Sequence, residues 1–308
     1  MSEYDVLIIG GGAAGLSAAL VLARARRSIV VIDGGAPRNA PAAHMHGFLS
    51  RDGVDPATFL AAGRSEVQRY GGEVRNAKAL DVVQTASGFC ARLSNGETAT
   101  GRRVLLATGL RDVLPDIPGI RERWGKDLLH CPYCHGWEVR DQPLGVLGAD
   151  HDAVQHALLL RQWSSDVILF TGSDRVGQSG HDALIARGVR IVSGAVASLA
   201  VENDRLVGVS LADGVVVPRD ALFVRPRFAP NDRLAVELGC ASDGTGWLIQ
   251  DGAGRTSVDG VWVAGNAGDP RAQVITAAGE GSAAAISING DLVAEDIEIA
   301  LSPTSTQV

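Results

Sequence analysis

The chain alternates between short apolar runs and longer amphipathic stretches, and this pattern occurs twice. Residues 4–9 form an apolar, β-branched run that ends at glycines, and residues 13–26 are rich in Ala and Leu. A second apolar run, 28–32, ends at Asp33. Such apolar runs are typical of parallel strands that are buried on both faces. The N-terminal segment therefore predicts a β–α–β unit.

A second unit of the same kind is expected near the middle of the chain. Its strands are predicted at 144–147 and 166–170, with a helix at 152–163 between them. The other predicted elements are a helix opened by Asp55-Pro56 and running to about Tyr70, strands at 79–83, 89–93, 103–107 and 260–264, a hairpin-like segment at 194–217 with turns at Asn203-Asp204 and Asp213-Gly214, a helix at 273–289, and a frayed polar tail from Ala300.

Composition and charge narrow the class of protein. A chain of 308 residues is too long for one ordinary domain, so two domains are expected. Hydrophobic residues at 46% and charged residues at 20% are unlike a disordered or fibrous composition. A net charge of −7 without a basic block argues against nucleic-acid binding. Apolar runs are too short to span a membrane, and Glu3 and Asp5 are unlike a signal peptide, so we expect a cytoplasmic protein.

The first unit carries a dinucleotide-binding pattern. Gly10, Gly12 and Gly15 match G-x-G-x-x-G between the first strand and its helix, and Asp33 follows 18 residues after Gly15. The glycines allow a tight turn, close approach of a pyrophosphate and close helix–strand packing, and the acid can accept hydrogen bonds from a ribose. The residues expected to contact the dinucleotide here are Gly10, Gly12, Ala13, Ala14, Gly15 and Asp33.

A segment near the C-terminus favours FAD over NAD at this site. The strand ending at Ala264 and the following Gly265-Asn266 match the second FAD motif of flavoproteins, which usually reads A-G-D. Asn266 can still hydrogen-bond the ribityl chain without adding charge, and Asp269 is a candidate for part of that role. The helix that begins at Gln273-Val274 would direct its N-terminus at the flavin N1–O2 edge.

The central part of the chain carries a C-x-x-C pair, Cys131 and Cys134, flanked by His130 and His135. Such a pair can form a small disulfide ring and exchange with other thiols. C-x-x-C-H also marks c-type haem attachment, which requires export, and a zinc site would need further ligands. The FAD pattern favours redox chemistry, so no metal is expected. The two other cysteines, Cys90 and Cys240, are interpreted as buried small hydrophobic residues.

The glycine motif, Ala107-Thr108-Gly109, the C-x-x-C pair and Gly265-Asn266 resemble the thioredoxin reductases in order and spacing, over nearly the whole chain. The resemblance implies an α/β fold with two Rossmann-like dinucleotide-binding domains. Residues 1–114 and 230–308 would form the FAD domain, with Gly109 at the flavin, and 115–229 an inserted module like the NADPH domain. It also implies a homodimer, with Cys134 next to the flavin C4a and Cys131 exchanging with substrate.

The chain departs from the thioredoxin reductases at three places. His135 replaces the Asp that acts as their general acid. Asp150 replaces the middle glycine of the NADPH motif, expected at 148–153, and Phe170-Thr171-Gly172 replaces the basic cluster for the 2′-phosphate. These departures, with the sequence C-P-Y-C-H-G, are similar to the dithiol oxidases of disulfide natural products of the holomycin and gliotoxin type. In that group a small dithiol reduces the cysteine pair, and electrons pass through FAD to O₂.

The interpretation that the residues favour is therefore an FAD-dependent dithiol oxidase with O₂ as acceptor and His135 as the base. One alternative is a thioredoxin reductase that acts on a thioredoxin-like protein and draws electrons from NADPH or another donor such as ferredoxin. Another is a non-catalytic flavin redox sensor. The substrate and the roles of His44, His46 and His130 stay open at this point.

Overall fold

The computed structural model describes residues 3–302, and this part of the chain divides into two compact units. Within the described residues, unit 1 comprises 3–40, 56–111 and 229–302, and unit 2 comprises Pro41–Asp55 and Asp112–Phe228. The expected domains, 1–114 with 230–308 and 115–229, differ from this division mainly at 41–55. That the units are independent domains stays a prediction.

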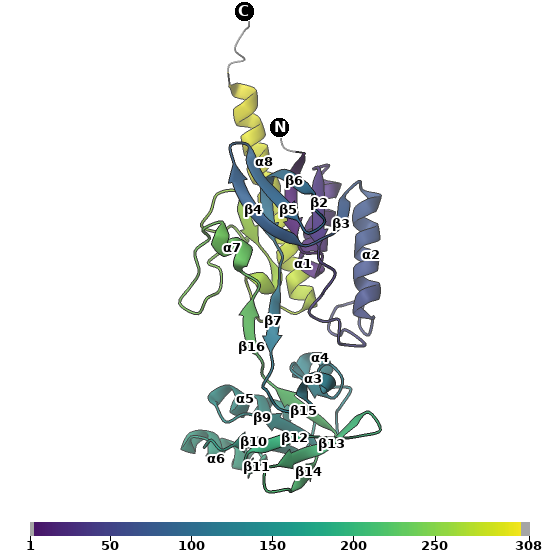
Figure 1. The fold of residues 1–308 in the computed structure, drawn as a ribbon, viewed down its shortest axis with the longest axis vertical. Coiled ribbons are helices and arrows are strands. Elements are labelled where there is room, and N and C mark those ends of the chain that lie inside the picture. The colour runs from purple at the N-terminus through teal and green to yellow at the C-terminus, as the bar shows by residue number, and fades with distance from the viewer. Residues whose placement is uncertain (1–2, 303–308) are drawn as a thin grey trace, which may run out of the picture. The chain divides into compact units, whose positions relative to one another are not determined.

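Unit 1 is built on a mixed sheet with strand order β3-β2-β1-β6-β5-β4, and β17 pairs with β6 (Figure 1). Strands β1, β2, β3, β6 and β17 run parallel to one another, whereas β5 runs antiparallel to both of its neighbours, β6 and β4. The elements are β1 (Tyr4–Ile9), α1 (Ala13–Arg24), β2 (Ile29–Asp33), α2 (Pro56–Arg69), β3 (Glu73–Asn76), β4 (Ala79–Thr85), β5 (Gly88–Leu93), β6 (Thr98–Leu106), α7 (Arg233–Glu237), β17 (Val261–Val263), η1 (Gly265–Ala267) and α8 (Val274–Leu301).

Side chains of β1 alternate between two hydrophobic layers. Val6 and Ile8 pack with α1 and α8 on one face of the sheet, and Leu7 and Ile9 pack on the opposite face. A run that is buried on both faces is what the unbroken apolar pattern predicts. Helices α1 and α8 touch closely, since a Cβ at Gly281 would lie 2.0 Å from the carbonyl oxygen of Ala14.

Unit 2 contains a parallel sheet in the order β11-β10-β9-β15-β8 and an antiparallel sheet in the order β12-β13-β14. Strands β7 (Leu110–Val113) and β16 (Arg227–Pro230) pair with each other where the chain passes between the units. The other elements are α3 (Ile120–Arg123), β8 (Leu128–Leu129), α4 (Pro132–His135), β9 (Leu144–Leu147), α5 (His151–Leu160), β10 (Val167–Gly172), α6 (Gln178–Ala186), β11 (Arg190–Ser193), β12 (Val196–Glu202), β13 (Arg205–Leu211), β14 (Val216–Pro218) and β15 (Ala221–Val224).

The α/β fold class and both β–α–β units are confirmed, but some predicted boundaries were wrong. Helix α8 ends at Leu301 and not at Asn289, because acidic side chains beyond Asn289 pair with arginines of unit 1. Asp296 lies 2.6 Å from Arg102, and Asp291 lies 2.6 Å from Arg103. The frayed tail predicted from Ala300 is therefore wrong at Ala300 and Leu301, and its part from 303 onward lies outside the described residues.

Two smaller predictions also need correction. The segment at 194–217 is more than a hairpin, because β12, β13 and β14 form a three-stranded meander. Its first turn is the predicted Asn203-Asp204, where both residues have positive φ. Cys240 is buried as expected, but Cys90 is only half-buried. Within residues 3–302, no helix has the length and apolar character needed to cross a membrane.

Candidate functional site

The glycine motif lies at the carboxyl end of β1, in unit 1. Strands β1 and β17 both run parallel to β6, so their carboxyl ends lie at one edge of the sheet. Two close approaches show that the sequence motifs meet there. A Cβ at Gly10, where φ is +112°, would lie 2.3 Å from the carbonyl oxygen of Ala107, and a Cβ at Gly265 would lie 2.9 Å from the Cβ of Ala14. The edge thus brings together the G-x-G-x-x-G turn, the Ala107-Thr108-Gly109 turn and the Gly265-Asn266 segment.

Gly12 and Gly15 differ in what surrounds them. A Cβ at Gly15 would lie 1.9 Å from the carbonyl oxygen of Gly10, so this glycine is required by the protein's own packing. A Cβ at Gly12 would meet no protein atom within 4 Å. Gly12 is also the N-cap of α1 and provides no side-chain cap for the helix N–H groups, including those near Ala13 and Ala14. Open space in front of an uncapped helix N-terminus fits a pyrophosphate.

Asp33 ends β2 beside this turn, and its carboxylate is held in place from two sides. Its Oδ2 accepts a hydrogen bond from Arg64 at 2.8 Å, and its Oδ1 accepts one from the backbone N–H of Gly35 at 3.1 Å. A Cβ at Gly11 would lie 2.5 Å from Oδ2. The carboxylate therefore lies against the glycine turn, in the place that a ribose-binding acid needs.

Gly109 lies in a turn that two hydrogen bonds with Asn231 stabilise. The side chain of Asn231 donates to the carbonyl oxygen of Thr108, and the Thr108 hydroxyl donates to the carbonyl of Asn231, both at 2.9 Å. Gly109 itself has a φ of +68°, and a Cβ there would meet no protein atom within 4 Å. Its conformation thus requires glycine although space is free around it.

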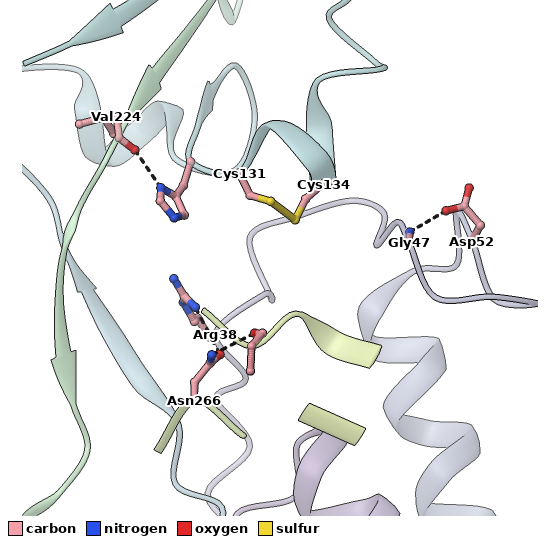
Figure 2. The surroundings of a disulfide bond; sticks show 9 residues. Arg38, Gly47, Asp52, Cys131, Cys134, Val224 and Asn266 are labelled. Carbon is pink, nitrogen blue, oxygen red and sulfur yellow. Dashed lines mark hydrogen bonds between the residues drawn. A yellow bond between two sulfur atoms is a disulfide. The ribbon is translucent and has the colours of Figure 1, made fainter. Parts of the chain in front are cut away.

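The side chain of Asn266 stabilises the loop that precedes α8. Its side-chain amide donates to the carbonyl oxygens of Asp269 at 2.9 Å and Ala272 at 3.0 Å, and its Oδ1 accepts from Arg38 at 3.3 Å (Figure 2). Gln273 is the N-cap of α8, and no side-chain hydrogen bond caps the helix, which begins at Val274. In this structure the Asn266 side chain hydrogen-bonds to the protein itself. A hydrogen bond from Asn266 to a ribityl chain, and any compensation by Asp269, stay predictions.

Cys131 and Cys134 of unit 2 are joined by a disulfide, with Cα atoms 5.2 Å apart (Figure 2). Cys131 is the N-cap of α4, and Pro132 is the first residue of this helix, a position that proline favours. The backbone N–H groups of Cys134 and His135 both bond to the carbonyl oxygen of Cys131, at 3.2 and 3.1 Å. The short helix thus sets the spacing that lets the two sulfurs meet.

His135 follows Cys134 and is half-buried in unit 2. Burial lowers the pKa of this imidazole, while the carboxylate of Glu138 raises it and His46 lowers it. The ring is therefore neutral at pH 7 and can accept a proton from a thiol.

His130, on the other side of the cysteine pair, lies against the unit 2 sheet. Its Nδ1 is 3.2 Å from the carbonyl oxygen of Val224 (Figure 2). Its ring meets the ring of His156 edge to face, with the two ring centroids 6.2 Å apart. His156 is buried, and burial lowers its pKa to about 4. A sheet contact of this kind positions the start of the C-x-x-C segment.

The second glycine turn of the chain, in unit 2, departs from the nucleotide-binding pattern. Gly148 keeps a positive φ of +135°, but Asp150 caps α5, its Oδ1 accepting from the backbone N–H of Ala153 at 2.8 Å. Asp152, in the first turn of α5, forms an ion pair with Arg225 at 2.7 Å. The Asp150 carboxylate thus occupies the helix N-terminus that would face a pyrophosphate, and Asp152 adds a second carboxylate in the first turn.

The end of β10 carries no basic side chain, as Phe170-Thr171-Gly172 predicts, and Phe170 and Thr171 are buried. Arg161 lies at the other end of α5, where its Nε donates to the carbonyl oxygen of Arg187 at 2.7 Å. Arg175 is exposed. Arg161 is therefore engaged away from the glycine turn and does not replace the missing cluster.

A family model described as pyridine nucleotide-disulphide oxidoreductase matches residues 4–281. This chain belongs to that family. The thioredoxin reductase tcpT of Claviceps purpurea is 34% identical over 284 residues, which cover 86% of each protein. The thioredoxin reductase sirT of Leptosphaeria maculans is 32% identical over 316 residues and 96% of each. The crystal structure of HlmI is similar with a TM-score of 0.94 and 55% identity, over 97% of this chain and 95% of that one.

As a pyridine nucleotide-disulphide oxidoreductase of the thioredoxin reductase-like type, the chain is an enzyme and a flavoprotein whose cofactor is FAD. The open space at Gly12 and the uncapped start of α1 fit that cofactor. When bound, FAD supplies a two-electron acceptor that dithiol–disulfide chemistry requires.

Some contacts of the candidate site residues and of the histidines around the cysteine pair were not predicted from the sequence. Arg64 holds Asp33, and Glu280 of α8 accepts a hydrogen bond from the backbone N–H of Gly265 at 2.8 Å, with burial raising the pKa of the carboxyl. His46 and Glu138 pair with each other within unit 2. None of these pairs has a local sequence signal, because the partners lie far apart along the chain.

Proposed function

We propose that this flavoenzyme is a dithiol oxidase, which converts a small dithiol into a disulfide and passes the electrons to O₂. The observation that carries the proposal is the hydrogen bond from the Ala153 N–H to the Asp150 carboxylate. At the start of α5, the pyrophosphate of NADPH would accept hydrogen bonds from backbone N–H groups, and the Asp150 carboxylate now takes that place.

Electrostatics support the same conclusion. Asp150 and Asp152 are negative and would repel phosphates, and Asp152 also pairs with Arg225. The arginines that would bind a 2′-phosphate are absent from the end of β10. Each charge-assisted hydrogen bond is worth about 1.5–3 kcal/mol. Losing two of them weakens NADPH binding by about a hundredfold or more.

The proposed chemistry balances without a nicotinamide. A substrate thiolate attacks the Sγ of Cys131, the bond between Cys131 and Cys134 breaks, and Cys134 leaves as a thiolate. The second substrate thiolate then attacks the substrate sulfur of the mixed disulfide and releases the Cys131 thiolate. The substrate loses two electrons and two protons, so that one dithiol and one O₂ give one disulfide and one H₂O₂.

His135 accepts the thiol protons in this scheme. Its half-buried imidazole has a lowered pKa, so the ring nitrogen is unprotonated at neutral pH. We further propose that Cys134 is the sulfur that transfers electrons to FAD, that Cys131 exchanges with the substrate, and that the enzyme acts as a homodimer.

A second candidate function is thioredoxin reduction with NADPH or another donor such as ferredoxin. The relatives tcpT and sirT are both named thioredoxin reductases. Arg225 provides a cation beside the second glycine turn, where a nicotinamide nucleotide would need one. Under this candidate a thioredoxin-like protein replaces the small dithiol as partner.

Product stoichiometry under air tests the proposal. The FAD-loaded enzyme is supplied with a small dithiol, and oxygen uptake, H₂O₂ and substrate disulfide are measured together. We expect the three quantities to be equal, and Cys131→Ser to abolish all of them while Cys240→Ser, a change at a cysteine outside the pair, does not. Disulfide formation without oxygen uptake would contradict the proposed acceptor.

A further inference from the structure

We propose that Arg64 of α2 is a positioning residue for FAD, which acts through Asp33 and favours the binding of FAD over FMN. Arg64 and Asp33, the acid at the end of β2, both belong to unit 1. FAD binding does not depend on whether the electrons come from a dithiol or from NADPH, so Arg64 has this role under either candidate function.

Arg64 lies at a position of α2 where an apolar residue is expected. Leu60 and Val67 of this helix are buried in the hydrophobic core of unit 1. Arg64 follows Leu60 by four residues and precedes Val67 by three, so the three side chains share one face of the helix. A charged side chain on such a face is costly unless an opposite charge pairs with it. Asp33 is that partner, because its Oδ2 lies 2.8 Å from a guanidinium nitrogen of Arg64.

Helix α2 approaches α1 closely at the residue before Arg64. A Cβ at Gly63 would lie only 3.1 Å from Cδ1 of Leu16. Leu16 is buried and belongs to α1, the helix that begins at the glycine turn. The missing side chain of Gly63 therefore lets α2 lie against α1, and this packing brings the guanidinium of Arg64 to Asp33 at the end of β2.

The Asp33 carboxylate can still bind a ribose although the protein already contacts both of its oxygens. Oδ1 accepts a hydrogen bond from the backbone N–H of Gly35, and Oδ2 accepts one from Arg64. A carboxylate offers about four acceptor sites, so acceptor capacity remains for the hydroxyls of the adenosine ribose. The carboxylate also lies against the glycine turn, since a Cβ at Gly11 would lie 2.5 Å from Oδ2. Arg64 thus helps to fix the ribose-binding acid before the cofactor arrives, which lowers the entropic cost of binding.

The positive charge of Arg64 has a second effect on FAD. The pyrophosphate of FAD is negatively charged and would bind at the glycine turn, so an uncompensated carboxylate at Asp33 would repel it. The guanidinium stays charged at any working pH and compensates the carboxylate that it contacts. FMN has neither the adenosine ribose nor a pyrophosphate, and it gains from neither effect. Arg64 therefore favours FAD over FMN.

The first test is a partition experiment, in which FAD-loaded enzyme is dialysed against FAD with an excess of FMN and the bound flavins are released by heat and separated. We expect Arg64→Met to lower the ratio of bound FAD to bound FMN by about tenfold, because one charge-assisted hydrogen bond is lost. Arg64→Lys keeps the charge and should retain most of the ratio. Arg69→Met, at an exposed arginine of the same helix, is the control and should not change it. An unchanged ratio in Arg64→Met would overturn the proposal, since a less stable helix alone would weaken both flavins alike.

The second test determines whether Arg64 acts through Asp33. Dissociation constants for FAD are measured on dilution of the loaded wild type, Arg64→Met, Asp33→Asn and the double variant. We expect Arg64→Met to weaken FAD binding about tenfold when Asp33 is present, and by less than about twofold in the Asp33→Asn protein. The same factor in both proteins would contradict a role through Asp33. The partition experiment needs no Asp33 variant, so it decides the matter even if Asp33→Asn retains too little FAD. Neither test measures turnover, and both results are independent of the dithiol oxidase proposal.

Discussion

The Asp150 carboxylate of the second glycine turn accepts a hydrogen bond from the backbone N–H of Ala153 at 2.8 Å. Asp150 is thus the N-cap of α5, and the side chain that departs from the nucleotide motif has a structural use. The fold tolerates an aspartate in place of the glycine of a phosphate-binding turn, because its carboxylate accepts a hydrogen bond from an N–H group at the helix end. A bound phosphate would otherwise accept that hydrogen bond.

We predict that Asp150→Ala lowers the free energy of unfolding by about 0.5–2 kcal/mol, because the cap is lost. Urea unfolding measures the change. Asp174→Ala, at an exposed position of the same unit, is the control and should change stability by less than about 0.5 kcal/mol. Equal effects of the two substitutions would mean that the Asp150 hydrogen bond does not stabilise the helix.

Two neighbouring glycines should respond differently to a side chain. Gly12→Val should yield folded protein without FAD, because a Cβ at this position meets no protein atom within 4 Å, whereas the added side chain would fill the space of the pyrophosphate. Gly15→Ala should fold poorly, because its Cβ would lie 1.9 Å from the carbonyl oxygen of Gly10. Flavin absorbance and circular dichroism separate the two results, and a Gly12→Val protein that retains FAD would argue against this site.

The two cysteine variants of the enzyme should differ in their visible flavin spectra. Cys131→Ser leaves Cys134 without its disulfide partner, and we expect the Cys134 thiolate to give a long-wavelength charge-transfer band with the flavin. Cys134→Ser should lack that band and trap mixed disulfides at Cys131. Visible spectra and mass spectrometry of the trapped adduct are the measurements. If the two spectra were exchanged, the roles assigned to the cysteines would be reversed.

His135→Ala should slow turnover by roughly a hundredfold or more, with the FAD content unchanged. Because burial lowers the pKa of His135, wild-type activity should persist below the ordinary pKa of histidine. It should be lost only as the pH falls through the lowered pKa and the ring becomes protonated. A pH–rate profile measures this limb, and a His135→Ala variant with most of its activity would make the residue structural.

The glycine motif, the C-x-x-C pair and the β–α–β units could be predicted because each is specified by a few adjacent residues. Asp33 was found for the same reason, since it follows a strand at a fixed spacing. Its partner Arg64 was not, because the contact depends on how α2 packs and no local pattern encodes that. The extent of α8 was missed because its last turns are stabilised by Arg102 and Arg103, which lie far away in sequence.

The contacts of the loop 41–55 could not be predicted from the sequence for the same reason. The sequence indicated that His44 and His46 could matter, but not which side chain they would meet. The contact between His46 and Glu138 joins residues 92 positions apart, and the loop that carries His46 groups with unit 2. The chemistry of His135 could thus be predicted by residue type, and its electrostatic surroundings could not.

The measurement that tests the central claim most directly is anaerobic mixing of the oxidised flavoenzyme with excess NADPH or with a small dithiol while flavin absorbance is followed. The capped start of α5 and the missing basic cluster predict no bleaching by NADPH. They also predict bleaching by the dithiol and full recovery of colour when air is admitted. Bleaching by NADPH within seconds would contradict the dithiol oxidase account and establish a nicotinamide-dependent reductase.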